Sequence, residues 1–220
     1  MKTSRSSSKM TRPILLPLPN APSDAELVAR AVSSGSAGDR FGRELIYRRH
    51  AAYLLAMVTR LVSSRDGAEA LVRETFVLAW KRLGTLPTTR ETTTDQSVDL
   101  RLWLSRIAVG LARRRLRRDR MLRFIGFGPD RDDQDQDGTL AALAAVDLRH
   151  EAREDLEHVD RVLDRAGVEP RIAWMLRRVD GLALDDVAAA CTCSPATAQR
   201  RIAEIDARLC DRFGTPAESP

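Results

Sequence analysis

The sequence lacks any apolar run long enough to cross a membrane. Its 220 residues contain no stretch of about 18 apolar residues free of charge. The short apolar patch near the start, ILLPLP, is broken by Pro17 and Pro19, so it cannot form the apolar core of a signal peptide. We therefore expect residues 1–22 to be a disordered tail, and we expect no insertion into a membrane.

Cysteine and histidine are also scarce, with three of each. Cys191, Cys193 and Cys210 are an odd number and lie late in the chain, which does not resemble an extracellular disulfide framework and fits a reducing cytoplasm. Cys191 and Cys193 with the distant His150 and His158 do not match the spacing of zinc ligands. These cysteines are better explained as small buried residues or as a redox-sensitive turn, and we expect a cytoplasmic protein without a metal.

Catalytic motifs are missing as well. The three histidines are scattered, and no phosphate-binding loop of the form GxxxxGKS occurs. The aspartates between 130 and 137 lack the spaced ligands and the glutamate of a calcium loop. We therefore expect no enzymatic activity and no cofactor.

No segment shows the strict alternation of apolar and polar residues that is typical of a β-strand, so the sequence predicts an all-α fold. Ser23 followed by Glu26 forms a capping-box pattern, which predicts that a helix begins at Asp24. The apolar spacing then predicts a long second helix over residues 37–62.

A third helix is predicted after residue 66. Asp66 and Glu69 form another capping pair, and the apolar positions that follow place the end of this helix near Leu83. Residues 84–99 are polar, rich in threonine and interrupted by a proline, so they predict a long loop. Loops of this length in compact domains are usually functional or disordered.

Lysine is nearly absent, so almost all of the positive charge is arginine, which suits phosphate and guanine edges. The formal net charge of +5 indicates a polyanionic partner, either nucleic acid or an acidic protein surface.

The positive charge is densest at LARRRLRRDR, residues 111–120, within a predicted fourth helix. Apolar residues from Leu100 to Leu116 line one side of this helix, and Arg106, Arg113 and Arg117 follow one another on the other side.

Residues 124–138 have the composition of a solvated linker, with three glycines, a proline and five aspartates. Helical patterning then resumes over residues 139–165. Three shorter helices are predicted at 169–178, 184–190 and 195–209. The chain therefore divides into two small helical domains joined by a flexible linker.

The segment GLALDDVAAACTCSPATAQRRIAEIDARL predicts a helix-turn-helix. CTCS forms the turn, Ser194 can cap the second helix, and Pro195 occupies its first position. Thr197, Gln199 and Arg200 then face outward near the helix start, where a recognition helix contacts base edges and phosphates in the major groove. An ordinary helical hairpin remains the alternative from this pattern alone.

Three segments together resemble a bacterial RNA polymerase sigma factor of the extracytoplasmic-function type. They are GAEALVRETFVLAWKRL, LRLWLSRIAVGLARRRLRR and GLALDDVAAACTCSPATAQRRI, and their order and spacing match over residues 24–213. The resemblance implies a subunit that binds the core polymerase, directs it to specific promoters and helps to melt the minus-ten element. It also implies an anti-sigma protein as a partner.

The resemblance assigns the following segments. Residues 1–22 are a tail, 23–123 a sigma region 2-like domain for the polymerase clamp and the minus-ten element, 124–149 an acidic flexible linker, 150–213 a sigma region 4-like helix-turn-helix domain, and 214–220 a tail.

The resemblance also implies three groups of functional residues. Those for the clamp of the largest polymerase subunit are Arg73, Glu74, Phe76 and Trp80, the two aromatic residues acting chiefly by packing. Those for the opened minus-ten DNA are Trp103, Arg106, Arg113, Arg114 and Arg117. Those for the minus-thirty-five duplex are Thr197, Gln199, Arg200 and Arg201.

The sequence departs from the usual family pattern at five positions. Ala70 and Arg73 stand where the family has an acid and a glutamine, and Gly110 replaces an asparagine. Glu204 and Asp206 stand where arginines are common, and an acid beside phosphates is repulsive, although Glu204 could accept from a cytosine amino group. These changes either weaken or retune binding to polymerase and DNA.

Two other functions are compatible with these departures. Ala70 and Gly110 permit a DNA-binding regulator that keeps the scaffold but does not initiate transcription. Glu204 and Asp206 permit a protein that titrates anti-sigma factors without binding DNA.

Overall fold

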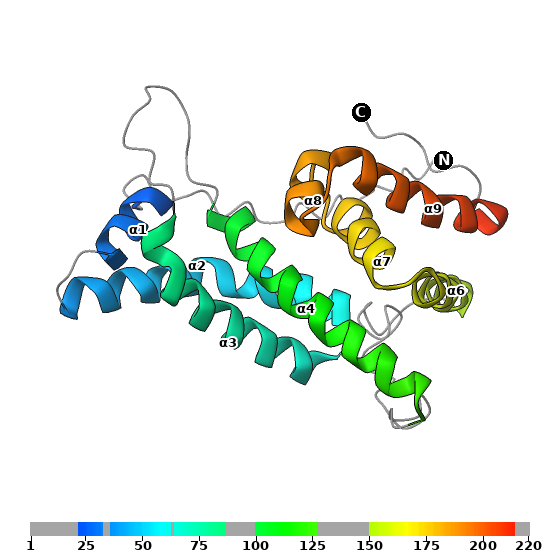
Figure 1. Ribbon diagram of the computed structural model, residues 1–220, viewed down its shortest axis with the longest axis horizontal. Coiled ribbons are helices and arrows are strands. Elements are labelled where there is room, and N and C mark those ends of the chain that lie inside the picture. Colours follow the sequence, from blue (N-terminus) through cyan, green and yellow to red (C-terminus); the bar gives the residue numbers. More distant parts are fainter. Residues whose placement is uncertain (1–21, 33–35, 63, 87–99, 127–149, 214–220) are drawn as a thin grey trace, which may run out of the picture.

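The computed structural model describes residues 22–32, 36–62, 64–86, 100–126 and 150–213. Over these ranges every regular element is helical, which confirms the predicted all-α fold (Figure 1). The α-helices are α1 (Asp24–Val32), α2 (Ser36–Val62), α3 (Arg65–Arg82), α4 (Leu100–Phe124), α6 (His150–Ala166), α7 (Val168–Trp174), α8 (Leu184–Cys191) and α9 (Pro195–Phe213). A short 3₁₀ turn (Leu83–Thr85) follows α3, and a π-helical turn (Met175–Val179) follows α7.

Several predicted segments lie outside the described residues. These are the first tail up to residue 21, the loop from residue 87 to 99, the linker from 127 to 149 with the start of the predicted helix at 139, and the last tail.

The predicted capping box begins α1. The Ser23 amide donates to Glu26 Oε2 at 2.7 Å, and the Glu26 amide donates to Ser23 Oγ at 3.2 Å. Each side chain thus satisfies a backbone group that the first helical turn leaves unpaired. The helix begins at Asp24, as the sequence predicts.

Asp24 fastens α1 to α2. Its carboxylate accepts from Arg49 Nη1 at 2.5 Å, and its other oxygen lies 3.2 Å from His50 Nε2. Burial alone would raise the pKa of Asp24, but the hydrogen bonds and charges of His50 and Arg49 outweigh it and hold the pKa below its ordinary value of 3.8. The ionised carboxylate is therefore the form that the fold stabilises.

Asp24→Asn should lower the free energy of unfolding by about 1–2 kcal/mol at pH 7, because the variant loses charge-assisted hydrogen bonds. Since the folded pKa of Asp24 is lowered, this contribution is present above pH 3.8 and is lost as the pH falls through the lowered pKa. Urea unfolding of both chains at several pH values should show a difference that shrinks in acid. A difference that stays constant down to the acid limit would contradict this assignment.

The cap of α3 differs from the sequence prediction. Ser64, not Asp66, occupies the cap position, and its hydroxyl accepts from the Gly67 amide at 3.2 Å. Asp66 lies within the first turn instead, where its charge is favourable to the helix dipole. The prediction of an Asp66–Glu69 cap was therefore wrong by two residues, because serine and aspartate are similarly good caps and sequence alone does not rank them here.

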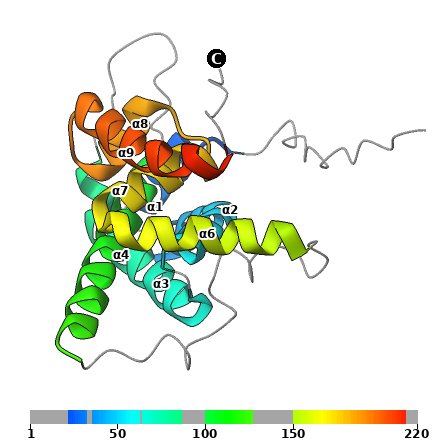
Figure 2. The ribbon, with the colours of Figure 1, turned by 90° about the vertical axis from the view of Figure 1, so that its right-hand side faces the viewer.

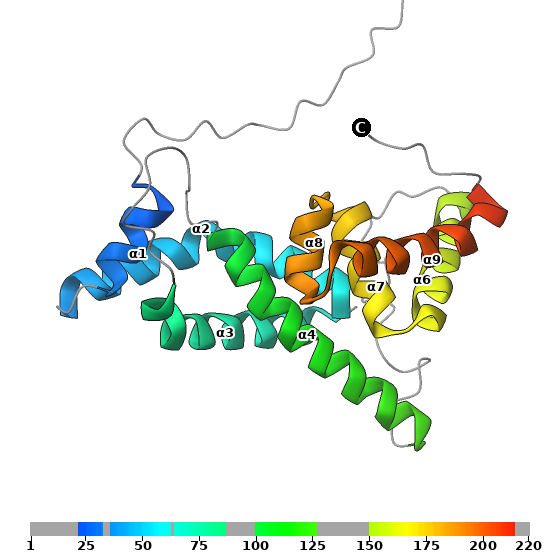
Figure 3. The same cartoon turned by 45° about the horizontal axis from the view of Figure 1, so that its top comes forward.

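Helices α1 to α4 form one bundle. Long α2, α3 and α4 lie side by side, and α1 packs against the first half of α2 (Figures 1 and 3). Fully buried side chains fill the space between them, including Leu27 of α1, Leu54 of α2 and Leu104 of α4. Burying apolar surface contributes about 25 cal/mol per Å² to the free energy of folding, so this shared core stabilises the bundle. The last turns of α4 extend past the bundle.

Helices α6 to α9 form a second group, and the view in Figure 2 has this group facing the reader. Leu163, Ile172 and Ile205 are fully buried at its centre and come from α6, α7 and α9. This group packs against the first one: α8 and α7 lie along the middle of α4 (Figures 1 and 3). The two groups are therefore in direct contact through α4.

Candidate nucleic-acid interface

The basic residues predicted for DNA lie along one face of α4, which we call the arginine surface: Arg106, Arg113, Arg114 and Arg117. Arg106 is exposed, and the side chains of Arg114 and Arg117 are 70% and 63% exposed. The Arg113 side chain is only 17% exposed, because α7 and α8 cover it. Three of the four cations therefore face solvent, where they can pair with phosphates.

Trp103 is half-buried and packs against the core beneath α4. The loop that it was predicted to adjoin lies outside the described residues from residue 87 to 99. The packing fits a core anchor that leaves part of the ring accessible.

Gly110 lies in the middle of α4. A Cβ added to it would meet no atom within 4 Å outside the helix's own backbone. Packing therefore does not require glycine at this position. Gly110 stands where the family usually has an asparagine, so a side chain that could form hydrogen bonds is missing. The structure shows no close packing at this position that would require a glycine instead.

The aromatic residues predicted for the polymerase clamp are packed into the bundle. Phe76 is only 3% exposed and lies between two other rings, with centroid distances of 4.8 Å to Tyr47 and 5.5 Å to Trp80. The Arg43 guanidinium stands 5.8 Å from the centroid of the Trp80 ring. Phe76 thus supports the outer face of α3 from the core side, while the rings of Tyr47 and Trp80 remain partly accessible to solvent.

Arg73 and Glu74 of α3 are both exposed. Glu74 Oε1 lies 3.9 Å from Arg114 Nη2, and both side chains are more than half exposed, so this ion pair contributes little to stability. This weak contact therefore does little to hold the Glu74 carboxylate in place. The predicted clamp surface and the arginine surface meet at this pair.

The helix-turn-helix forms as the sequence predicts. Thr192 ends α8 in the left-handed conformation with φ of 53°, and the Cys193 amide donates back to the Ala188 carbonyl at 3.0 Å. Ser194 then caps α9 by accepting from the Thr197 amide at 3.2 Å. Pro195 is the first residue of α9.

The start of α9 presents its polar residues outward. Gln199 and Arg200 are exposed, whereas Thr197 is half-buried, its hydroxyl 2.9 Å from Ser194 Oγ. Ile202 on the opposite side is buried against the other helices of the group. Of the four residues predicted for the upstream duplex, Gln199 and Arg200 are directly accessible, while Arg201 turns toward α7.

The two acids of α9 have different environments. Asp206 accepts from Trp174 Nε1 at 2.9 Å and pairs with Arg178 at 2.6 Å, so its charge is compensated within the helical group. Glu204 is exposed and pairs with Arg208 one turn later at 2.8 Å. Of the two, only Glu204 keeps its charge on the solvent side of α9. Glu204 is therefore the one that could repel a DNA phosphate or contact a base.

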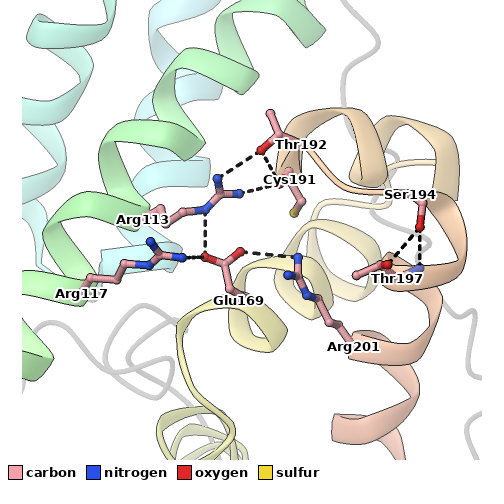
Figure 4. Close-up of polar contacts among 8 residues, drawn as sticks. All are labelled: Arg113, Arg117, Glu169, Cys191, Thr192, Ser194, Thr197 and Arg201. Carbon is pink, nitrogen blue, oxygen red and sulfur yellow. Dashed lines mark hydrogen bonds and ion pairs between the residues drawn. The ribbon is translucent and has the colours of Figure 1, made fainter.

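Glu169, at the start of α7, joins the two helical groups and was not singled out from the sequence (Figure 4). Its Oε1 accepts from Arg117 Nη2 at 2.7 Å and lies 3.1 Å from Arg113 Nε. Its Oε2 lies 3.5 Å from Arg201 Nη1. One carboxylate therefore contacts three arginines that the sequence assigned to two separate DNA surfaces.

The three cysteines are free thiols. Within the part of the chain that the structure describes, no cluster of three or more metal-ligating side chains occurs. Cys191 is buried, and burial raises the pKa of its thiol to about 11, so it stays protonated and unreactive at neutral pH. The described helices also include none that is long and apolar enough to span a membrane.

Two solved structures share this arrangement of helices. One is CnrH in complex with the cytosolic domain of CnrY, at 21% identity and a TM-score of 0.53, covering 86% of this chain and 98% of the CnrH chain. The other is the sigma factor RpoE in complex with the anti-sigma factor NepR from Bartonella quintana, at 22% identity and a TM-score of 0.51, covering 76% of this chain and 94% of that one.

The chain has a sigma-factor fold. No family model matches the sequence, and no curated protein matches it. The resemblance found from the three sequence segments and the likeness in structure thus agree on the same fold. In this sigma-factor fold the arginine surface lies on α4, and the exposed start of α9 lies in the second group.

Proposed function

We propose that this chain is a sigma factor of the extracytoplasmic-function type, which binds core RNA polymerase, directs it to specific promoters and helps to melt the minus-ten element. The observation that carries the proposal is the sigma-factor fold, with an arginine-rich α4 and a capped helix-turn-helix in the corresponding order. In this account residues 23–123 and 150–213 are the two working domains, and residues 124–149 connect them.

The polymerase-binding surface is the outer face of α3. Arg73 and Glu74 are its exposed charges, and Phe76 and Trp80 support the face from within. Glu74 offers a carboxylate to basic residues on the clamp of the largest subunit, at the cost of only a weak contact with Arg114.

The arginine surface holds the backbone of the opened minus-ten strand. Arg106, Arg114 and Arg117 are exposed, Arg117 also donating to Glu169, and Arg113 lies beside them with its side chain largely covered. Such contacts supply affinity that depends on salt and not on sequence. The exposed part of Trp103 offers a ring for an unstacked base, which compensates part of the few kcal/mol that unstacking costs.

The start of α9 contacts the minus-thirty-five duplex in the major groove. Gln199 and Arg200 are the side chains placed to reach base edges, since both are exposed in the first turns of the helix. Thr197 and Arg201 flank them and suit phosphate contacts. Arg201 becomes available for DNA when Glu169 releases it.

An anti-sigma protein is the expected regulator. The CnrH and RpoE structures are both complexes with another protein, and the partner of RpoE is an anti-sigma factor. We propose that this chain has such a partner and works in the cytoplasm. Catalysis belongs to the polymerase, and the chain itself is not an enzyme.

Transcription with purified core polymerase tests the proposal. On a template that carries the upstream region of the chain's own gene, we expect transcripts that depend on this chain and on that region, and none on a template with the region replaced. Binding to the duplex without transcripts would indicate a stand-alone regulator, as Gly110 and Ala70 permit. Neither binding nor transcripts, with tight binding to an anti-sigma protein, would indicate a titrator.

A further inference from the structure

The last turns of α4 carry a group of large apolar side chains that are exposed to solvent. The exposed fraction is 66% for Met121, 91% for Phe124 and 50% for Ile125. These turns extend past the rest of the bundle (Figures 1 and 3). Single exposed apolar residues are normal on protein surfaces, but adjacent ones at a projecting helix end indicate a place of contact.

The end of this helix is regular. The Ile125 amide donates to the Met121 carbonyl, and the Gly126 amide donates to the Arg123 carbonyl, both at 3.2 Å. Gly126 has a φ of 75°, the left-handed conformation in which a glycine commonly ends a helix. The exposure of the apolar side chains therefore does not result from a frayed last turn.

The apolar group continues the arginine surface along α4. Residues that are three, four or seven positions apart lie on one side of a helix. Arg117, Met121 and Phe124 have this spacing, and so do Arg118, Met121 and Ile125. Cations and apolar side chains therefore share one side of the helix end.

More arginines surround the same helix end. The α4 tip, as we call it, consists of Arg118, Arg120, Met121, Arg123, Phe124 and Ile125, and its three arginines are exposed. At about 100° per residue, Arg123 lies across the helix from Met121, whereas Arg118 lies on the same side. The one acid of α4, Asp119, lies 3.5 Å from Arg115 Nε. The apolar side chains are therefore ringed by positive charge that α4 itself does not neutralise.

A partner for the α4 tip must offer negative charge and apolar surface together. A DNA duplex offers the charge, and an unpaired strand also offers bases for stacking, but only Phe124 of the three apolar side chains is aromatic. A groove on another protein takes up one face of a helix, whereas the arginines here surround the helix end.

An anionic lipid surface meets both requirements. Its phosphates suit guanidinium groups, and an acyl boundary lies directly beneath them. Apolar side chains of basic surface-binding helices enter that boundary by about 5–10 Å. Arginine has a long apolar stem, so its charge can stay at the phosphates while shorter neighbours go deeper.

The sequence changes its charge soon after the tip. Residues 130–137 contain five aspartates and one arginine. An anionic surface attracts the arginines of the α4 tip and repels these aspartates. The contact is therefore confined to the helix end and remains reversible.

We propose that the α4 tip binds the surface of an anionic membrane, with Met121, Phe124 and Ile125 entering the boundary below the headgroups while the three arginines pair with lipid phosphates. The contact is with the surface and uses no membrane-spanning helix. It is independent of the sigma-factor function, because none of the six residues of the tip is assigned there to polymerase or DNA.

Sedimentation of the full chain with lipid vesicles tests the proposal. One set of vesicles contains phosphatidylglycerol and phosphatidylcholine at about 30:70, and the other contains phosphatidylcholine alone. We expect the wild-type chain to bind the anionic vesicles at least about tenfold more tightly than the neutral ones, with an affinity that falls as salt is raised.

Two variants separate the apolar contact from the charged one. The apolar variant is Met121→Gln, Phe124→Gln and Ile125→Gln, and its control changes three exposed apolar residues elsewhere, Val32→Gln, Phe41→Gln and Val179→Gln. The arginine variant is Arg118→Gln, Arg120→Gln and Arg123→Gln, and its control is Arg30→Gln, Arg153→Gln and Arg161→Gln.

We expect each tip variant to lose at least about fivefold in affinity for the anionic vesicles, while each control matches the wild type. Circular dichroism shows whether each variant keeps its helices. Phe124→Gln alone, at the most exposed position, repeats the apolar test if the triple variant does not keep them.

Four results would overturn the proposal. Wild-type affinity in both tip variants would place vesicle binding on another surface, and a loss in the arginine variant alone would show attraction of charges without entry of apolar side chains. If the apolar variant lost affinity for a labelled single-stranded oligonucleotide of about 20 nucleotides but not for vesicles, the occupant of the tip would be nucleic acid. A wild-type chain that bound neither kind of vesicle would leave a protein as the partner of the tip.

Discussion

Replacing Arg113, Arg114 and Arg117 with glutamate should abolish open promoter complexes while leaving the capture of the chain by core polymerase intact. Each reversal removes one positive charge and adds one negative charge, so the three take the formal net charge from +5 to −1. The contacts with the opened strand become repulsive, and we expect at least about a hundredfold loss of open complexes. Permanganate footprinting of melted thymines measures the opening, and co-elution with core polymerase measures the capture.

The matched control reverses Arg30, Arg153 and Arg161, three exposed arginines on α1 and α6, and gives the same net charge. It should open promoters as the wild type does. Persistent opening by the variant would show that the arginine surface is misassigned.

Gly42→Ala and Gly110→Ala should change stability in opposite directions. A Cβ at Gly42 would lie 2.9 Å from the Ala31 amide nitrogen and 3.0 Å from the Leu27 carbonyl oxygen, so α1 must shift away from α2. We expect a loss of about 1–3 kcal/mol in the free energy of unfolding. At Gly110 the space is open, and alanine should add up to about 1 kcal/mol through its better helix propensity.

Urea unfolding of the three chains measures both effects, and the Gly110 variant serves as the control for replacing a helical glycine. Equal effects at the two positions would mean that the close approach of α1 and α2 does not limit the residue at position 42. Promoter opening by the Gly110 variant should be unchanged if this position makes no contact with DNA beyond its backbone.

The parts of the fold set by local chemistry could be predicted from the sequence. The caps at Ser23 and Ser194 need only neighbouring residues, and both form as predicted. The error at the start of α3 has the same origin, because Ser64 and Asp66 offer equivalent caps two residues apart. Choosing between them depends on how α3 packs against the rest of the bundle, which local sequence does not record.

The contacts of the candidate site depend on residues far apart in the chain and could not be predicted. Helical periodicity correctly placed Arg113 and Arg117 away from the bundle core, but Glu169 lies 52 residues beyond Arg117. The sequence predicts that Asp206 repels phosphates, but its carboxylate accepts a hydrogen bond from Trp174, which lies 32 residues earlier. A glutamate at the start of a helix is also common, because its negative charge is favourable near the positive end of the helix dipole. Nothing in the sequence therefore indicated that Glu169 contacts arginines of α4 and α9.

The proposed function depends above all on the binding of the purified full chain to core RNA polymerase. We expect a one-to-one complex with a Kd of about 1 μM or tighter at moderate salt, weakened by Glu74→Lys on the outer face of α3 and unaffected by Glu157→Lys on α6. Titration by fluorescence anisotropy of the labelled chain measures both. If the wild-type chain bound core polymerase at no salt concentration, it would not be a sigma factor.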